Sequence, residues 1–326
     1  MHVSVESLMV ARRPERTLFI LGGVMVGVAV LFLLFGASGQ WDFVLPFRGR
    51  KLATALLVGY AIAVSTVLFQ TVSGNRVLTP AILGFDNLYV FIQTCLLYFL
   101  GSGKAASLDP RLQFGVEVLI MVAFSAVLFW GLFGGGGRSL HLVLLTGVVL
   151  GVLFRSLASF LQRLIDPNEF IFLQDRFFAS FNNPDQELLV VAFVLTLGVS
   201  VVGLRMLKTF DVLVLGRETA INLGVDHQRT AAIILVLVAI LVSVSSALVG
   251  PVTFFGLLVS NLAHTLVRTY RHALVLPAAA LIAGVCLVAG QFVLEQVFQF
   301  NTSPRVIIDF VGGLVFIGML MRRAPV

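Results

Sequence analysis

The chain has 326 residues, of which 59% are hydrophobic and 12% are charged, and its formal net charge at pH 7 is +6. Soluble domains are usually about 45–50% apolar and about 25% charged, so this composition and a mean hydropathy of +1.03 exclude a soluble enzyme, a disordered chain and a secreted disulfide scaffold. We expect no nucleic-acid partner, because no basic, aromatic-interleaved stretch stands outside the apolar runs; in a membrane chain, excess positive charge more often holds loops in the cytoplasm.

Ten apolar stretches are predicted to be membrane-spanning helices, since crossing about 30 Å of hydrocarbon takes roughly 20 residues. In chain order they are 17–36, 52–69, 81–100, 116–133, 140–161, 188–207, 230–250, 252–267, 273–294 and 306–321. Polar residues interrupt 81–100, and 252–267 begins beside a proline. The expected fold class is therefore all-α: one polytopic transmembrane domain over residues 1–326, with no loop long enough for a second domain.

The charges flanking the spans predict the topology. Arginines precede the first span, whose apolar stretch is longer than the roughly 7–15 residues of a cleavable signal, so we expect residues 1–16 to be a cytoplasmic segment before an uncleaved span. Arg322 and Arg323 favour a cytoplasmic C-terminus as well. An even number of spans satisfies both ends, and the longest outer segment, 162–187, is expected to be an acidic loop.

Two spans share an internal repeat. Lys51–Ser65 reads KLATALLVGYAIAVS and Arg229–Ser243 reads RTAAIILVLVAILVS, and both end in Ala-Ile-x-Val-Ser. In the ten-span topology the first copy runs inward and the second outward, so the repeat is inverted. Inverted repeats are typical of transporters, although two apolar helices can also share letters by chance.

Enzyme chemistry has no sequence support. Gly101-Ser102-Gly103-Lys104 fails as a phosphate loop, because Tyr98 and Ala105 stand where that motif needs glycine and Ser or Thr, and we expect a loop there. The five histidines lack metal-ligand spacing. We therefore expect no catalytic residue, no metal site and no cofactor bound directly by this chain.

Ionisable residues inside spans are costly and are functional candidates by default. They allow a proton relay, but a position near a helix end or beside a wet cavity explains most of them. A position near a helix end or beside a wet cavity explains Asp309 least well. The candidates are Asp86, Glu117, Arg155, Glu295 and Asp309.

Several motifs in order carry a family resemblance. From about residue 48 onward the chain resembles the FecCD-type permease subunit of bacterial importers for iron–siderophore complexes, heme and vitamin B12. The matching segments are Gln70 with Asn75, Pro80 and Ile82-Leu83-Gly84; Leu145-Thr146-Gly147 with Leu150-Gly151; Ala220–Val225; Gly250-Pro251 with Phe254–Val259; and Pro304, Gly312-Gly313 and Phe316.

The chain also departs from that family's pattern. These departures resemble the catecholate-siderophore branch, whose permeases often pair with a second, different permease. They are Arg76 in place of a proline, Ser260-Asn261 in place of Pro-His, Gln291 and Glu295 in place of an Asp and an Arg, Val306 in place of a glycine, and Ala179–Asn183 in place of a Gly-Ser segment.

The resemblance implies an importer subunit of the bacterial inner (plasma) membrane. Such a subunit dimerises, with a homodimer or a heterodimer both open, and moves ferric siderophores from periplasm to cytoplasm between its two copies. A cytoplasmic ATP-binding-cassette ATPase uses the ATP, and a periplasmic or lipoprotein binding protein delivers the chelate. The alternative is a proton-coupled secondary transporter, which the inverted repeat and Asp309 would also fit.

The resemblance also implies site residues. Arg48, Arg50 and Lys51 would meet the binding protein, although interfacial anchoring by snorkelling explains them equally well. The polar segment 211–229 would couple to the ATPase, or else is a simple loop. Its proposed contact residues are Arg217, Glu218, Thr219, Ala220, Ile221, Asn222, Leu223 and Gly224, and the inner gate would comprise Asn75, Val77, Leu140 and His141.

Overall fold

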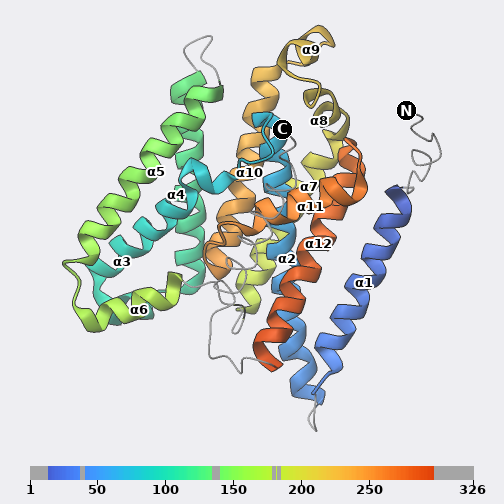
Figure 1. The fold of residues 1–326 in the computed structure, drawn as a ribbon. Helices are drawn as coiled ribbons and strands as arrows, with labels where there is room; N and C mark the ends of the chain where they lie inside the picture. Colours follow the sequence, from blue (N-terminus) through green and yellow to red (C-terminus); the bar gives the residue numbers. More distant parts are fainter. Residues whose placement is uncertain (1–13, 37–40, 134–139, 178–180, 182–184, 297–326) are drawn as a thin grey trace, which may run out of the picture.

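The computed structural model describes residues 14–36, 41–133, 140–177, 181 and 185–296 (Figure 1). All regular secondary structure in those residues is helical. The helices are α1 (Pro14–Leu34), α2 (Trp41–Ser73), the short 3-10 helix η2 (Pro80–Leu83), α3 (Phe85–Ser107), α4 (Pro110–Phe133), α5 (Leu140–Gln162), α6 (Pro167–Phe177), α7 (Gln186–Arg205), α8 (Leu207–Leu213), α9 (Arg217–Asn222), α10 (His227–Val249), α11 (Phe255–Val267) and α12 (His272–Gln296).

Nine of the ten predicted spans coincide with helices, and the all-α polytopic fold is confirmed. Among the described residues, α1, α2, α4, α5, α7, α10 and α12 are long and apolar enough to cross a membrane. The predicted span 306–321, with Asp309, lies outside the described residues. The two interrupted stretches behave differently: α3 leaves helical geometry at Gly101 (φ 73°, ψ 162°), and α11 has only 13 residues, about 20 Å of helix, which is too short to cross the hydrocarbon alone.

Two predicted loops are wrong. Gly101–Lys104 lies within α3, which continues to Ser107 beyond the break. Part of the acidic segment 162–187 forms α6, which Asp166 begins by accepting a hydrogen bond from the backbone N of Asn168 at 2.8 Å. Glu169 of α6 then accepts from the backbone N and Oγ of Ser102, at 3.2 and 3.3 Å. Carboxylates that looked like loop charges therefore cap α6 and join it to α3.

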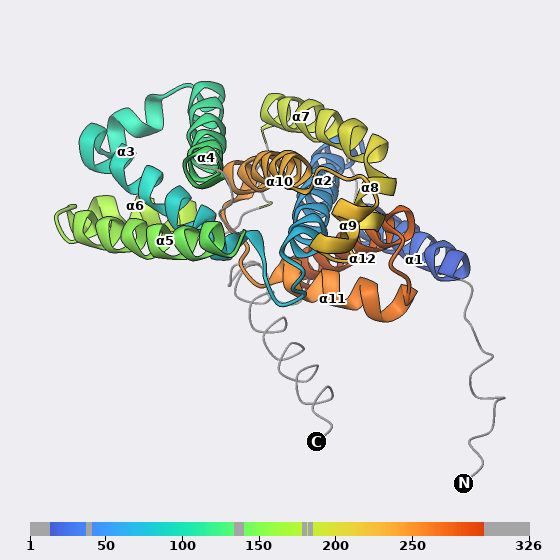
Figure 2. The ribbon, with the colours of Figure 1, turned by 90° about the horizontal axis from the view of Figure 1, so that it is seen from above.

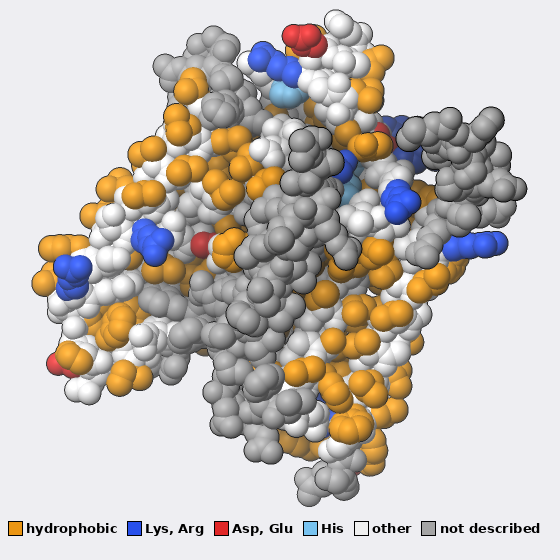
Figure 3. Space-filling view, viewed as in Figure 1, with side chains coloured by type: hydrophobic (Ala, Val, Ile, Leu, Met, Phe, Trp, Pro, Cys, Tyr) orange, Lys and Arg blue, Asp and Glu red, His pale blue; other side chains and the backbone are white. Residues whose placement is uncertain are grey.

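Helices α2 and α10 form the centre of the bundle (Figure 2). Both are apolar on every side, which suits a helix enclosed by others, and residues 61–70 of α2 are all buried. Helix α2 packs against α10 and α12, and α10 packs also against α4 and α7. Outer helices instead expose apolar side chains, and hydrophobic groups are spread widely over the described surface in Figure 3.

The repeated sequences lie on the two central helices. Lys51–Ser65 is in α2 and Arg229–Ser243 is in α10, and the two helices pack against each other. Figure 1 shows them running in opposite directions, because α2 ends and α10 begins on the side of the bundle that carries α9. We call this side the α9 end and the opposite side the α6 end.

Candidate functional site

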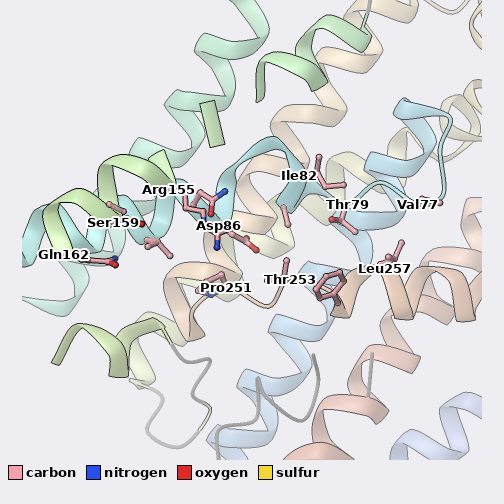
Figure 4. Close-up of a pocket in the computed structure, with 15 residues that line it drawn as sticks. Val77, Thr79, Ile82, Asp86, Arg155, Ser159, Gln162, Pro251, Thr253 and Leu257 are labelled. Atoms are coloured by element: carbon pink, nitrogen blue, oxygen red, sulfur yellow. The ribbon is translucent and has the colours of Figure 1, made fainter. Parts of the chain in front are cut away.

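A cavity of about 740 Å³ lies among α3, α5, η2 and the start of α11 (Figure 4). Its wall mixes apolar side chains with polar ones from four separate parts of the chain. The polar groups are Thr79 just before η2, Asp86 and Asn87 from α3, Arg155, Ser159 and Gln162 from α5, and Thr253 from the turn before α11. The volume falls in the range of sites for small molecules, about 300–1,000 Å³.

Close contact between two glycine motifs shapes the cavity. Gly84 ends η2 with φ +90°, a backbone conformation that residues other than glycine rarely adopt. A Cβ on Gly84 would lie 2.7 Å from Cα of Gly151, and a Cβ on Gly147 would lie 2.7 Å from Cδ2 of Leu83. Small residues four apart on a membrane helix let another backbone approach closely. The motif at Gly147 and Gly151 and the motif at Leu83-Gly84, which were matched separately in the sequence, therefore pack against each other.

The polar residues of α5 form a stripe toward the cavity. Arg155, Ser159 and Gln162 stand four and three residues apart, which places them on one helix face. Gln162 donates through Nε2 to Oγ1 of Thr94 on α3 at 3.2 Å. Asp86 lines the same cavity from the first turn of α3, where the helix dipole favours a carboxylate. A positive and a negative side chain therefore share this cavity.

The departures from the family pattern contact one another near Val77, at the edge of the cavity. Gln70 donates through Nε2 to the carbonyl oxygen of Arg76 at 2.8 Å and to Oγ of Ser260 at 3.0 Å. Nδ2 of Asn261 donates to the same carbonyl at 3.3 Å. The segment after α2 is thus fixed to α11 by polar contacts, and the replacements at 76, 260 and 261 form one network.

The proposed gate residues are only partly brought together. Asn75 accepts a hydrogen bond from the backbone N of Val77 at 2.9 Å, and both residues are exposed. Val77 lines the cavity, whereas Leu140 and His141 begin α5, some 14 residues before the first α5 residue in that wall. Their gating role stays a prediction.

The predicted coupling segment 211–229 is not a simple loop: it begins in the last turn of α8, contains all of α9 and ends in the first turn of α10. Helix α9 covers Arg217–Asn222 and stops as expected at Gly224, which has φ +82°. Val225 N donates to the Ala220 carbonyl and Gly224 N donates to the Ile221 carbonyl, at 3.0 and 2.9 Å, the pattern of a glycine-terminated helix. Ala220 is buried, while the rest of Arg217–Gly224 is exposed, including the apolar Ile221 and Leu223.

Hydrogen bonds between polar side chains join this segment to the long helices α2 and α12. Asp211 of α8 accepts from the backbone N of His272 and contacts its Nδ1, both at 2.7 Å, and Nε2 of His272 lies 2.8 Å from Oγ1 of Thr71 on α2. His272 is buried and its ring also meets Phe210 edge to face. Sequence reasoning missed this link, because its three residues are far apart in the chain and match no motif.

The predicted docking cluster is less exposed than its charge suggests. Nη1 of Arg48 donates to the carbonyl oxygens of Phe32 and Phe35 at the end of α1, at 3.1 and 2.6 Å, and Arg50 is half-buried. Lys51 is only 4% exposed, with its Nζ 2.8 Å from Oε1 of Glu295. Lys51 is therefore engaged inside the bundle, and its docking role stays an untested prediction.

Among the other ionisable candidates in spans, Glu117 is held by two glutamines. Glu117 of α4 accepts through Oε1 from Nε2 of Gln93 and Nε2 of Gln113, at 2.6 and 2.8 Å. Over the residues that the structure describes, His, Cys, Asp and Glu side chains form no group of three that could hold a metal ion.

Comparisons with known proteins agree over most of the chain. The model of the FecCD transport family matches residues 16–323. Petrobactin import system permease protein YclO of Bacillus subtilis (strain 168) is 48% identical over 303 residues, which cover 92% of this chain and 96% of that protein. Petrobactin import system permease protein FatC of Bacillus anthracis is 34% identical over 284 residues, covering 86% of this chain and 80% of that protein.

A solved structure has the same fold. It is described as an inward-facing conformation of a metal-chelate type ABC transporter, and its TM-score with this chain is 0.83 at 25% identity. The match covers 95% of this chain and 100% of that one.

Proposed function

Because the chain belongs to the FecCD transport family, we propose that it is the permease subunit of an ATP-binding-cassette importer for ferric siderophores. The observation that carries this proposal is the cavity beside α5. Its walls come from segments with the family's motifs, its volume of about 740 Å³ suits a small chelate, and α5 is a membrane-spanning helix. The relatives named as petrobactin permeases support a siderophore as the cargo.

The energy for transport would come from a partner. ATP would bind to a separate cytoplasmic ATPase, so this subunit would be a path without an enzymatic activity and without a cofactor of its own. Helix α9 suits the contact with that ATPase, since Ile221 and Leu223 expose 49% and 59% of their surface beside the charged Arg217 and Glu218. Exposed apolar residues within a polar segment are typical of a partner site.

The orientation follows from the same assignment. If α9 meets the ATPase, then the α9 end, where α1 begins, is cytoplasmic and the α6 end faces the periplasm. The region of Arg48 and Arg50 then lies on the side where a binding protein would dock. The C-terminal arginines would be cytoplasmic if 306–321 is a tenth span.

A second permease copy would complete the path. Along α5, apolar side chains are exposed from one end of the helix to the other, and α5 also forms a wall of the cavity. Lipid would cover such a surface on an outer helix, but a second subunit placed there would close the cavity into a channel.

Reconstitution tests the proposal directly. Proteoliposomes would contain the permease with its candidate ATPase, and the binding protein would be added outside with an iron-55 chelate. We expect uptake that requires both ATP on the side of the membrane that carries the ATPase and the binding protein on the opposite side. Uptake driven by a proton gradient without ATP would instead support a secondary transporter, and Asp309→Asn would then abolish it.

A further inference from the structure

Arg155 is the residue whose position the fold alone does not explain. It lies within the span formed by α5, seven residues before the end of that helix, or about 10 Å along the axis. Arginine within a span is costly and usually faces a bundle interior or a water-filled space. Here it faces the cavity, and Ser159 and Gln162 continue the polar stripe on the same helix face.

The start of α3 brings a negative charge to the same cavity. Asp86 and Arg155 are neighbours in the cavity lining (Figure 4). Both charges border a cavity of about 740 Å³, with Asn87 and Thr253 also in its wall. The space is large enough for a ligand to approach the guanidinium.

We propose that Arg155, with Ser159 and Gln162, is a transient binding subsite for the anionic oxygens of a ferric chelate, and that Asp86 weakens it so that the chelate can leave. The inference rests on the proposed function. A guanidinium binds planar anionic groups through two parallel hydrogen bonds and stacks on aromatic rings. Carboxylate and catecholate groups of an iron chelate offer both features.

Asp86 gives the subsite its transient character. A path must bind its cargo well enough to admit it and weakly enough to release it. Asp86 competes for the guanidinium and repels the same anionic oxygens. The two residues therefore act in opposite directions on an anionic cargo, whereas the two halves of a structural ion pair would act in the same direction.

Equilibrium binding to the purified permease in lipid nanodiscs tests this difference. The probes are a ferric tris-catecholate, which is anionic, and a ferric tris-hydroxamate, which is uncharged, both labelled with iron-55. Arg155→Gln is expected to weaken binding of the anionic probe at least about tenfold, the usual effect of losing one charged hydrogen bond, and to change the uncharged probe less than about twofold. Asp86→Asn is expected to strengthen binding of the anionic probe.

Two further variants control for charge and folding. Arg155→Lys keeps the charge and should restore part of the anionic binding. Arg163→Gln removes an exposed arginine that follows α5 and does not line the cavity, so it should bind both probes as the wild type does. If Arg155→Gln and Asp86→Asn weaken both probes alike, or if Arg155→Gln binds the anionic probe normally, the subsite is refuted.

A protection experiment keeps the test valid if Arg155→Gln does not fold. With Cys95 and Cys286 replaced by serine, Ser159→Cys should be alkylated more slowly in the presence of the anionic probe and not of the uncharged one; equal alkylation rates would refute the subsite. These measurements need no ATPase. Failure of ATP-dependent uptake in proteoliposomes would count against the proposed function separately.

Discussion

Lys51 on α2 and Glu295 on α12 form an ion pair between the two helices, with 2.8 Å between Nζ and Oε1. Their side chains are only 5% and 10% exposed, and Nε2 of Gln291 donates to the same Oε1 at 2.9 Å. Gln291 and Glu295 are the two residues that replace an Asp and an Arg of the family pattern. The departure is thus explained by a partner on another helix.

Breaking this pair should destabilise the bundle. Lys51→Met leaves the Glu295 carboxylate buried without its cation, which costs roughly 3–5 kcal/mol, so the thermal unfolding midpoint in detergent should fall clearly. The double variant Lys51→Met, Glu295→Met should recover most of the loss. Glu187→Gln is the matched control: it breaks the exposed pair with Arg111, which is worth about 0–1 kcal/mol. Equal midpoints for Lys51→Met and the wild type would contradict the prediction.

Packing of α5 against η2 should tolerate no methyl group at Gly151. Its Cβ would lie 2.8 Å from Cα of Gly84, so Gly151→Ala must separate two backbones and should lower the unfolding midpoint and chelate binding together. Gly198→Ala in α7 is the control, because a Cβ at position 198 would have no neighbour within 4 Å. Alanine is also more favourable than glycine inside a helix, by about 1 kcal/mol. That control should be neutral or stabilising, and a harmless Gly151→Ala would show that α5 is not held by this contact.

The Asp211–His272–Thr71 link should affect coupling more than stability. It joins α8, which precedes α9, to α12 and α2, so movement of the coupling segment would reach both long helices through it. Asp211→Asn and Thr71→Val should each reduce the number of chelates imported per ATP several-fold while the ATPase still hydrolyses ATP. Asp109→Asn alters an aspartate that accepts from the backbone N of Arg111, away from α8, and should leave that ratio unchanged. Normal ratios in both link variants would remove this role.

Ile221 should lie within reach of the ATPase. Ile221→Cys is expected to crosslink to a cysteine in the ATPase groove, in a manner that depends on nucleotide. Ala220→Cys, on the buried side of the same helix, should not crosslink. Gly224→Val should uncouple ATP hydrolysis from uptake, because valine is strained at φ +82°. If Ile221→Cys is labelled only by an impermeant reagent added from outside, the topology is the reverse of the one proposed, and the importer function is refuted.

Charge at Arg50 should govern encounter with the binding protein. Exposed charges at an interface rim set association rates more than affinity, so Arg50→Glu should slow uptake at low binding-protein concentration and at low salt, and little at saturation. Arg163→Glu tests whether any arginine near the α6 end has the same effect. Unchanged uptake for Arg50→Glu at every concentration would leave the cluster as interfacial anchors only.

Local features of the sequence were enough to predict the membrane class, helices at nine of the ten expected spans, the opposed pair of repeats and the stop of α9 at Gly224. Each of these depends on hydropathy along a stretch of about 20 residues or on the backbone freedom of one glycine, and such properties are independent of the rest of the fold. Helix α6 was missed for the complementary reason: its polar composition resembles a loop until Glu169 contacts α3.

Only the tertiary structure decided which polar groups meet. Lys51 and Glu295, or Asp211 and His272, are separated by long stretches of chain, and nothing in either local sequence selects the partner. In an apolar bundle an unpaired charge or donor is costly, which favours a partner for each buried charge, but helix packing determines which one it reaches. The same packing placed Arg155 and Asp86, two isolated charges in the sequence, in the wall of one cavity.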